Sequence, residues 1–332
     1  MRTTQAVVQA LGRMDIHVAA AGRGVIDETL RKVGLPIQVQ QMPERSDATA
    51  IAYVRITEAG LELFLPRRSS ELAVIHELLH VLLLPEGYFF PMIWHPEPDV
   101  EAAIVAIVGG LIEVATHPQV RRCMESRGLD LRLFHQVQRV VPAMAHGHGE
   151  PTPEEEVQLA VTALMQLTEY PALRGEVERE FDEAYPEAAR LAGELLGAAE
   201  ASPVTDPKTF RELLRGMLSL ADQHIKRRGG ALPLSLYVPL PPICGMVELA
   251  RPAKDVIRVT DTSVLTILQS DSRPQSTPPA VFLVWKEDNS TVQVRSLAHS
   301  SLMLQVKDSL RKQMEQPLEA FLKGLRVPFV AA

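Results

Sequence analysis

Residues 69–84 read SSELAVIHELLHVLLL, and the interpretation of the rest of the chain starts from this stretch. The two serines are typical of a helix N-cap, and Glu71 would lie in the first helical turn. Apolar residues then continue without proline or glycine, which predicts a buried helix. That helix carries three ionisable side chains, His76, Glu77 and His80, on an otherwise apolar segment.

These three residues form the pattern HExxH. In a helix, positions i and i+4 project from one face, so the imidazoles of His76 and His80 can reach one metal ion. Glu77 can reach a water molecule at the metal without being a ligand itself. Burying two imidazoles and a carboxyl group without partners would cost roughly several kcal/mol. We therefore expect metal binding rather than two histidines packed into a helical core.

The residues before the motif predict helices followed by a small sheet. Residues 3–33 are expected to be helical, with an interruption near Gly22 and Gly24. Short alternating segments follow, and two of them are separated by a loop that contains Gly60. Two such segments joined by a short glycine-containing loop predict a β-hairpin. The expected strands are residues 36–41, 51–56 and 61–65.

The hairpin and the motif together resemble the zincin metallopeptidases. In that family an edge strand lies beside the HExxH helix and binds a peptide substrate in extended form. The resemblance covers roughly residues 35–130 and implies a Zn²⁺ cofactor with three protein ligands. Among the zincins, the small gluzincins related to the phage-repressor-cleaving peptidases are closest in layout.

A third zinc ligand must come from outside the motif. Residues 81–94 contain no histidine, which excludes the short metzincin spacing. Gluzincins take a glutamate from a second helix, and Glu113, 33 residues after His80, fits that position best. His117 lies four residues after Glu113 on the same helical face and is the alternative, either as the ligand or as a hydrogen-bond donor.

The helix that carries these candidates is expected to begin at Pro98 and to end near Thr116, since Pro118 would interrupt it. Residues 119–127 would then form a separate helix. The pair Gly109-Gly110 is expected to allow close approach of this helix to the HExxH helix.

Two further residues are candidates for catalysis. The segment between the predicted helices is rich in aromatic residues and prolines, and it contains Tyr88 and His95. Either side chain could line the cleft and donate a hydrogen bond to an oxyanion, although loop packing is the commoner role of such residues.

The overall composition favours a soluble, cytoplasmic protein. Apolar residues make 46% and charged residues 23% of the 332-residue chain, and only two cysteines are present, so a disulfide scaffold is excluded. The apolar segments are too short and too interrupted for a membrane span, which argues against an intramembrane metalloprotease and against a membrane partner. Basic residues are too dispersed to predict nucleic-acid binding. The sequence leaves the oligomeric state open.

The predicted fold class is α+β, in three parts. Residues 1–145 would form a zincin-like core, with a small β-sheet, the HExxH helix and the ligand helix. Residues 150–229 would form an acidic helical region, and residues 230–332 a small α+β accessory domain.

The expected function is hydrolysis of peptide bonds in a specific protein substrate. Zinc would activate water and Glu77 would act as the general base, which makes the chain a zinc metalloendopeptidase. The alternative is a weakly active or non-catalytic zincin-like binding or sensor protein, whose C-terminal domain recognises a partner.

Overall fold

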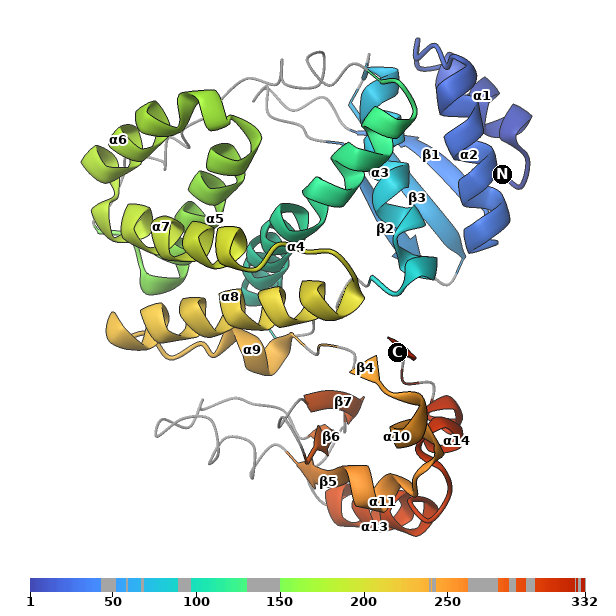
Figure 1. Cartoon of the computed structure of the whole chain (residues 1–332), viewed down its shortest axis with the longest axis vertical. Coiled ribbons are helices and arrows are strands. Elements are labelled where there is room, and N and C mark those ends of the chain that lie inside the picture. Colours follow the sequence, from blue (N-terminus) through green and yellow to red (C-terminus); the bar gives the residue numbers. More distant parts are fainter. Residues whose placement is uncertain are drawn as a thin grey trace.

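The computed structural model describes most of the chain as a mixed α+β structure that is mainly helical (Figure 1). The described residues are 1–42, 52–57, 59–66, 69–88, 97–129, 150–238, 240, 243–261, 280–286, 291–296, 302–325, 327 and 330–331. The predicted fold class is therefore confirmed at the level of α+β. The expected helix at residues 131–141 and the residue His95 lie outside the described residues.

A three-stranded sheet follows two N-terminal helices. The elements are α1 (Thr4–Gly12), α2 (Ala20–Val33), β1 (Ile37–Gln41), β2 (Tyr53–Thr57) and β3 (Gly60–Leu65). All three strands match the predicted segments. The sheet order is β1-β3-β2, with β1 parallel and β2 antiparallel to β3, so β2 is an edge strand of this sheet. Leucines at alternate positions of β3 are fully buried and anchor the sheet in the core.

The HExxH helix α3 (Glu71–Leu82) begins where its sequence predicts. The Ser70 hydroxyl accepts a hydrogen bond of 3.2 Å from the Ala73 N–H, as an N-cap does. The Glu71 carboxylate accepts bonds from the N–H groups of Ala19 and Gly22, at 2.8 and 3.1 Å. One side chain thus ties the start of α3 to the start of α2, which fixes the direction in which the motif helix runs.

The predicted interruption at Gly22 and Gly24 is wrong, because both glycines lie inside α2 and the break falls between residues 12 and 20. Gly22 is required for packing rather than for a turn. A Cβ atom at this position would lie 2.4 Å from the Glu71 Oε1 atom that the backbone binds.

The ligand helix α4 (Pro98–Ser126) is one continuous helix of 29 residues. The predicted end near Thr116 is wrong, since the helix continues through Pro118. A proline inside a helix costs roughly 3 kcal/mol, but the residues on both sides of it are buried and hold the two halves in line: Val114, Ala115, Val120 and Met124. Among the described residues, α4 is the one helix with the length and composition of a membrane span, and 56% of the span is buried within the protein.

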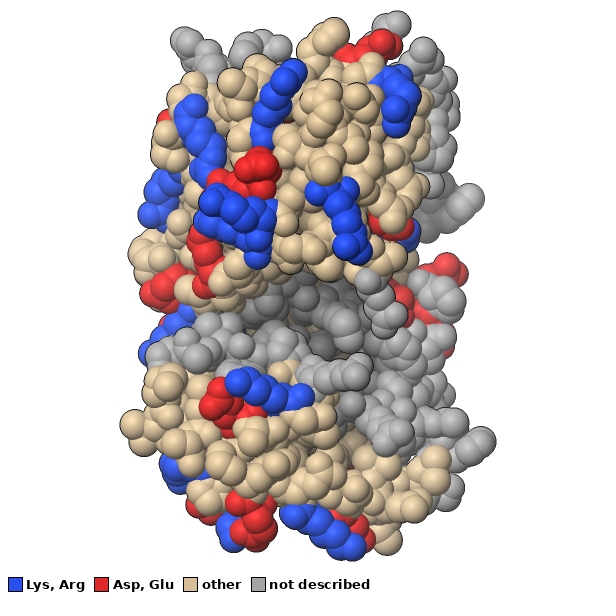
Figure 2. Space-filling model, turned by 90° about the vertical axis from the view of Figure 1, so that its right-hand side faces the viewer, with Lys and Arg blue, Asp and Glu red and all other residues tan. Residues whose placement is uncertain are grey.

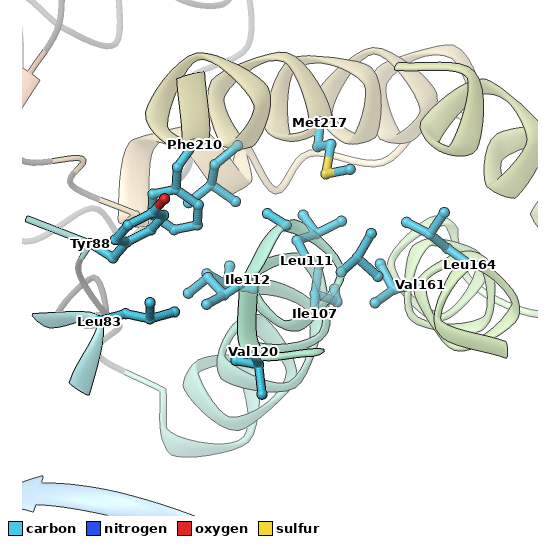
Figure 3. Close-up of a cluster of buried hydrophobic side chains, with 14 of the residues drawn as sticks. Leu83, Tyr88, Ile107, Leu111, Ile112, Val120, Val161, Leu164, Phe210 and Met217 are labelled. Carbon is cyan, nitrogen blue, oxygen red and sulfur yellow. The ribbon is translucent and has the colours of Figure 1, made fainter. Parts of the chain in front are cut away.

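Four further helices follow, namely α5 (Pro153–Glu169), α6 (Arg174–Ala184), α7 (Pro186–Ala201) and α8 (Pro207–Arg227). Of these, α5 and α8 pack against α4 and contribute to the hydrophobic cluster of Figure 3. Gly110 of α4 faces α5, where an added Cβ would lie 2.3 Å from Cγ1 of Val161. An added Cβ at Gly109 would meet nothing within 4 Å. The predicted role of this glycine pair is therefore corrected, because the close approach is to α5 rather than to the HExxH helix.

The C-terminal part has its own smaller hydrophobic core. Its elements are α9 (Leu234–Tyr237), β4 (Ile243–Cys244), α10 (Met246–Ala250), α11 (Ala253–Val256), β5 (Ile257–Asp261), β6 (Ala280–Trp285), β7 (Thr291–Ser296), α13 (Met303–Gln313), α14 (Leu318–Gly324) and β8 (Val330–Ala331). Alternate residues of β6 face opposite sides. Phe282 and Val284 belong to the large core, whereas Val281 and Leu283 belong to the small one, so β6 joins the two.

Figure 2 shows the face of the molecule that carries α1 and α2 above and the C-terminal part below. Basic and acidic side chains are interspersed on this face. On α2, Glu28 pairs with both Lys32 and Arg127 at 2.8 Å. The described side chains on this face therefore form no extended patch of one charge.

The two adjacent glycines of α4 provide a test of the α4–α5 contact. We predict that Gly110→Ala lowers the free energy of unfolding by about 1–3 kcal/mol, because the new methyl group must displace Val161 in a packed core. Gly109→Ala is the matched control and should be neutral or stabilising by up to about 1 kcal/mol, since alanine favours a helix where space is open. Urea denaturation measures both. Equal effects of the two substitutions would contradict this packing.

Candidate metal centre

Three buried histidines from two helices converge on one point. His76 and His80 extend from successive turns of α3, and His117 extends from α4. The Nε2 atom of His76 lies 3.2 Å from Nε2 of His117 and 3.3 Å from Nε2 of His80. Each of these residues is at most 8% exposed. Among the described residues, these three form the group of His, Cys, Asp or Glu residues that could hold a metal ion, with one ligand atom from each lying within 4.8 Å of the others.

The spacing of these nitrogens fits a tetrahedral metal ion. With Zn–N bonds of about 2.0–2.1 Å, two nitrogens bound to one tetrahedral zinc lie about 3.3 Å apart. The Nε2–Nε2 distances of 3.2 and 3.3 Å agree with this value. Three imidazoles would occupy three positions and leave the fourth open, which is the arrangement of a catalytic rather than a structural zinc site.

The hydrogen bonds at the other ring nitrogens direct the Nε2 lone pairs toward this point. The Thr116 hydroxyl donates to the Ile112 carbonyl at 2.8 Å, so it accepts from Nδ1 of His80 at 3.2 Å. Nδ1 of His117 donates to the carboxylate of Glu169. A histidine that is protonated on Nδ1 presents a free lone pair at Nε2, which is the form that binds metal.

The environment also disfavours protonation of His76 and His80. Burial lowers the pKa of His76 to about 4, against an opposing attraction from the charge of Glu169. Burial, together with the neighbouring His76 and His117, lowers the pKa of His80 well below its ordinary value. Because protons compete with a metal for imidazole, the cluster is ready to bind a cation at neutral pH.

Glu77 lies beside the cluster rather than in it. Its Oε1 atom is 3.1 Å from Nδ1 of His76, and the N–H of Val54 on the edge strand β2 donates to its carboxylate. Burial raises the pKa of Glu77 to about 8, although the charge of His117 and the Val54 bond act in the other direction. A carboxyl group with a pKa near neutrality can both accept and return a proton.

The structure brings His117, and not Glu113, into the group of converging ligand atoms. Glu113 is one helical turn before His117 on α4, where burial and the charges of Glu77 and Glu169 raise its pKa to about 7. The sequence had favoured Glu113 because of the family resemblance. The two residues share a helical face, so the pattern alone could not separate them.

Tyr88 lies in the hydrophobic cluster, where its ring packs against Phe210 with the ring centroids 5.4 Å apart (Figure 3). Burial and the charges of Asp206 and Glu86 raise its pKa. The described contacts of Tyr88 thus show the packing role and do not join it to the three histidines. His95 lies outside the described residues.

Four residues of the site have no signal in the sequence pattern. Val54, Thr116 and Glu169 contact Glu77, His80 and His117 respectively, and Arg121 pairs with Glu169. Thr116 is next to a candidate ligand and could have been suspected. Glu169 lies 52 residues from His117 on another helix, so only the packing of α5 against α4 reveals it.

No family model, no curated protein and no solved structure matches this chain. The function is therefore inferred from the geometry of the cluster and from the chemistry of its residues.

The identity of the third ligand can be tested by metal analysis. We predict one zinc ion per native chain after zinc loading and dialysis, and loss of that zinc in His80→Ala and His117→Ala, because each removes one converging nitrogen. Glu113→Gln should keep the zinc and serves as the matched control. Retention of zinc by His117→Ala together with its loss in Glu113→Gln would assign the third position to Glu113.

A second prediction concerns the protein treated with a chelator. Since the pKa of Glu77 is raised from 4.5 to about 8, the folded state binds more protons than the unfolded state between these values, and stability falls as the pH rises. The Glu77→Gln variant lacks this dependence. As the pH rises from about 5 to about 8, the native chain should lose about 3 kcal/mol of unfolding free energy that the variant does not lose.

Denaturant unfolding across this pH range measures the difference, in which the contributions of the histidines cancel. Glu178→Gln, at an exposed ion pair with Arg174, is the control and should follow the native curve. A Glu77→Gln curve parallel to the native one would contradict the raised pKa.

Proposed function

We propose that the chain is a zinc-dependent metalloendopeptidase of the zincin type, which hydrolyses a peptide bond in a protein substrate. The observation that carries this proposal is the convergence of three buried imidazoles, with two Nε2–Nε2 distances that fit a tetrahedral metal ion and with the Glu77 carboxyl group alongside. A structural zinc site has four protein ligands and needs no adjacent base. The combination of three ligands and one base is what metal-assisted hydrolysis requires.

In the proposed mechanism, the metal ligands, Glu77 and the edge strand β2 have separate roles. His76, His80 and His117 would hold a zinc ion, which would supply Lewis acidity and lower the pKa of a water molecule toward about 7. Glu77 would take the proton from this water and return it to the leaving amine, a role for which its place beside His76 suits it. The edge strand β2 supports this proposal, because an edge strand offers unpaired backbone groups to an extended peptide.

A binding or sensor role is the second candidate, and the burial of the centre favours it. The three histidine residues are only 5–8% exposed, and Glu77 is already engaged by the N–H of Val54. A sealed metal site stabilises a fold without turnover. The intact carboxyl beside the histidines favours the enzyme, because a site that only binds metal has no need for a buried acid that costs stability.

Digestion of a peptide library by the zinc-loaded protein, with mass spectrometry of the products, tests the proposal. We predict that the native chain cleaves a subset of peptides with a common sequence preference. Glu77→Gln should keep its zinc and lower the cleavage rate by about 10²–10⁴-fold or more, because it removes only the general base. Glu178→Gln, on the exposed surface, should cleave at the native rate.

Cleavage by Glu77→Gln at the native rate would overturn the role of Glu77. Zinc binding by the native chain without cleavage of any peptide would favour the binding or sensor protein instead.

A further inference from the structure

The last residue of α5 lies directly behind the metal-binding face of His117. Oε1 of Glu169 accepts from Nδ1 of His117 and also pairs with Nη2 of Arg121 at 2.6 Å. The same guanidinium donates to the Thr168 carbonyl through Nη1 and Nη2, at 3.3 and 3.2 Å. Arg121 therefore holds both the end of α5 and the carboxylate that contacts the histidine.

This position is unfavourable for a carboxylate unless it has partners. The C-terminal end of a helix carries a partial negative charge, which repels an acidic side chain. The Glu169 side chain is only 15% exposed, so it has also lost most of its hydration. His117 and Arg121, both on α4, compensate for this cost.

The packing of α4 against α5 sets this geometry. Gly110 lets Val161 of α5 approach α4 closely, and Glu169 follows Val161 by eight residues on the same helical face. His117 and Arg121 likewise follow Gly110 at helical spacing. The helix contact and the carboxylate–histidine contact are thus two ends of one interface.

We propose that Glu169 and Arg121 are positioning residues for the metal ligand His117, so that α5 is an integral part of the metal centre. The proposal rests on the metal site within the proposed function, but not on peptide cleavage. The carboxylate fixes the proton of His117 on Nδ1, turns the ring toward His76 and His80, and makes Nε2 a stronger ligand. Arg121 holds the carboxylate in place through its ion pair and through its bonds to the end of α5.

If Glu169 and Arg121 served only as an ion pair between helices, their substitution would have a different effect. Loss of such a pair would lower the stability of the chelated protein and leave the intrinsic affinity of the folded site for metal unchanged. Loss of a positioning contact changes the affinity and the geometry of the ligands. The two roles are separated by measuring zinc affinity, the absorption spectrum of the cobalt-loaded protein and the unfolding of the chelated protein on the same variants.

The test uses the full chain and the substitutions Glu169→Gln, Glu169→Ala and Arg121→Ala, with Glu178→Gln as the matched control at an exposed Arg–Glu pair. Competition with a chelator gives zinc affinity. Glu169→Gln should weaken it about 10–100-fold. Glu169→Ala should weaken it further, because the amide of Gln still offers an oxygen to Nδ1, and Arg121→Ala should act in the same direction. The cobalt spectrum should shift in each variant, and the control should match the native chain.

Native zinc affinity and an unchanged cobalt spectrum in both Glu169 variants would overturn the proposal, and Glu169 would then be a structural ion pair. If Glu169→Ala fails to fold, Glu169→Gln and Arg121→Ala decide the matter. A native chain that binds zinc but cleaves no peptide would leave the positioning result intact and reject only the peptidase. A native chain that binds neither zinc nor cobalt would overturn both.

Discussion

The main constraint on this molecule is the convergence of three buried imidazoles. Nε2 of His76 lies 3.2 Å from Nε2 of His117 and 3.3 Å from Nε2 of His80. Burying such polar groups costs free energy unless they have partners, so the elements around them must hold their positions. Glu71 fixes α3 against α2, and the long helix α4 delivers His117 to the same point. The close contact at Gly110 then brings α5 behind that histidine. The site thus depends on four helices rather than on the motif helix alone.

The carboxyl groups around the cluster divide according to their environment. Glu77 and Glu113 are buried with little compensation, which raises their pKa values to about 8 and about 7. Burial opposes the ionisation of Glu169, but the bond and charge of His117 and the charge of Arg121 outweigh it and lower its pKa to about 2. One carboxylate is therefore a permanent acceptor that orients a ligand, whereas Glu77 can exchange a proton. This separation of pKa values is what acid–base chemistry at one site requires.

Local signals in the sequence predicted the local structure well. The Ser70 cap, the apolar run of α3 and the alternation in β2 and β3 each depend on neighbouring residues, so they could be recognised without tertiary information. The failures concern tertiary packing. Pro118 is tolerated because buried residues on both sides hold α4 together, and Gly110 packs against α5 rather than α3. The choice between Glu113 and His117 depended on helix rotation, and Glu169 depended on a contact between distant segments.

The central claim is that His76, His80 and His117 together bind one metal ion through Nε2. X-ray absorption spectroscopy of the zinc-loaded chain measures this most directly, because imidazole rings scatter in a characteristic way beyond the first coordination shell. The account predicts four-coordinate zinc with three imidazole ligands at about 2.0–2.1 Å and one further light-atom ligand. A spectrum with two imidazoles and additional oxygen ligands, or with sulfur from a cysteine, would contradict it.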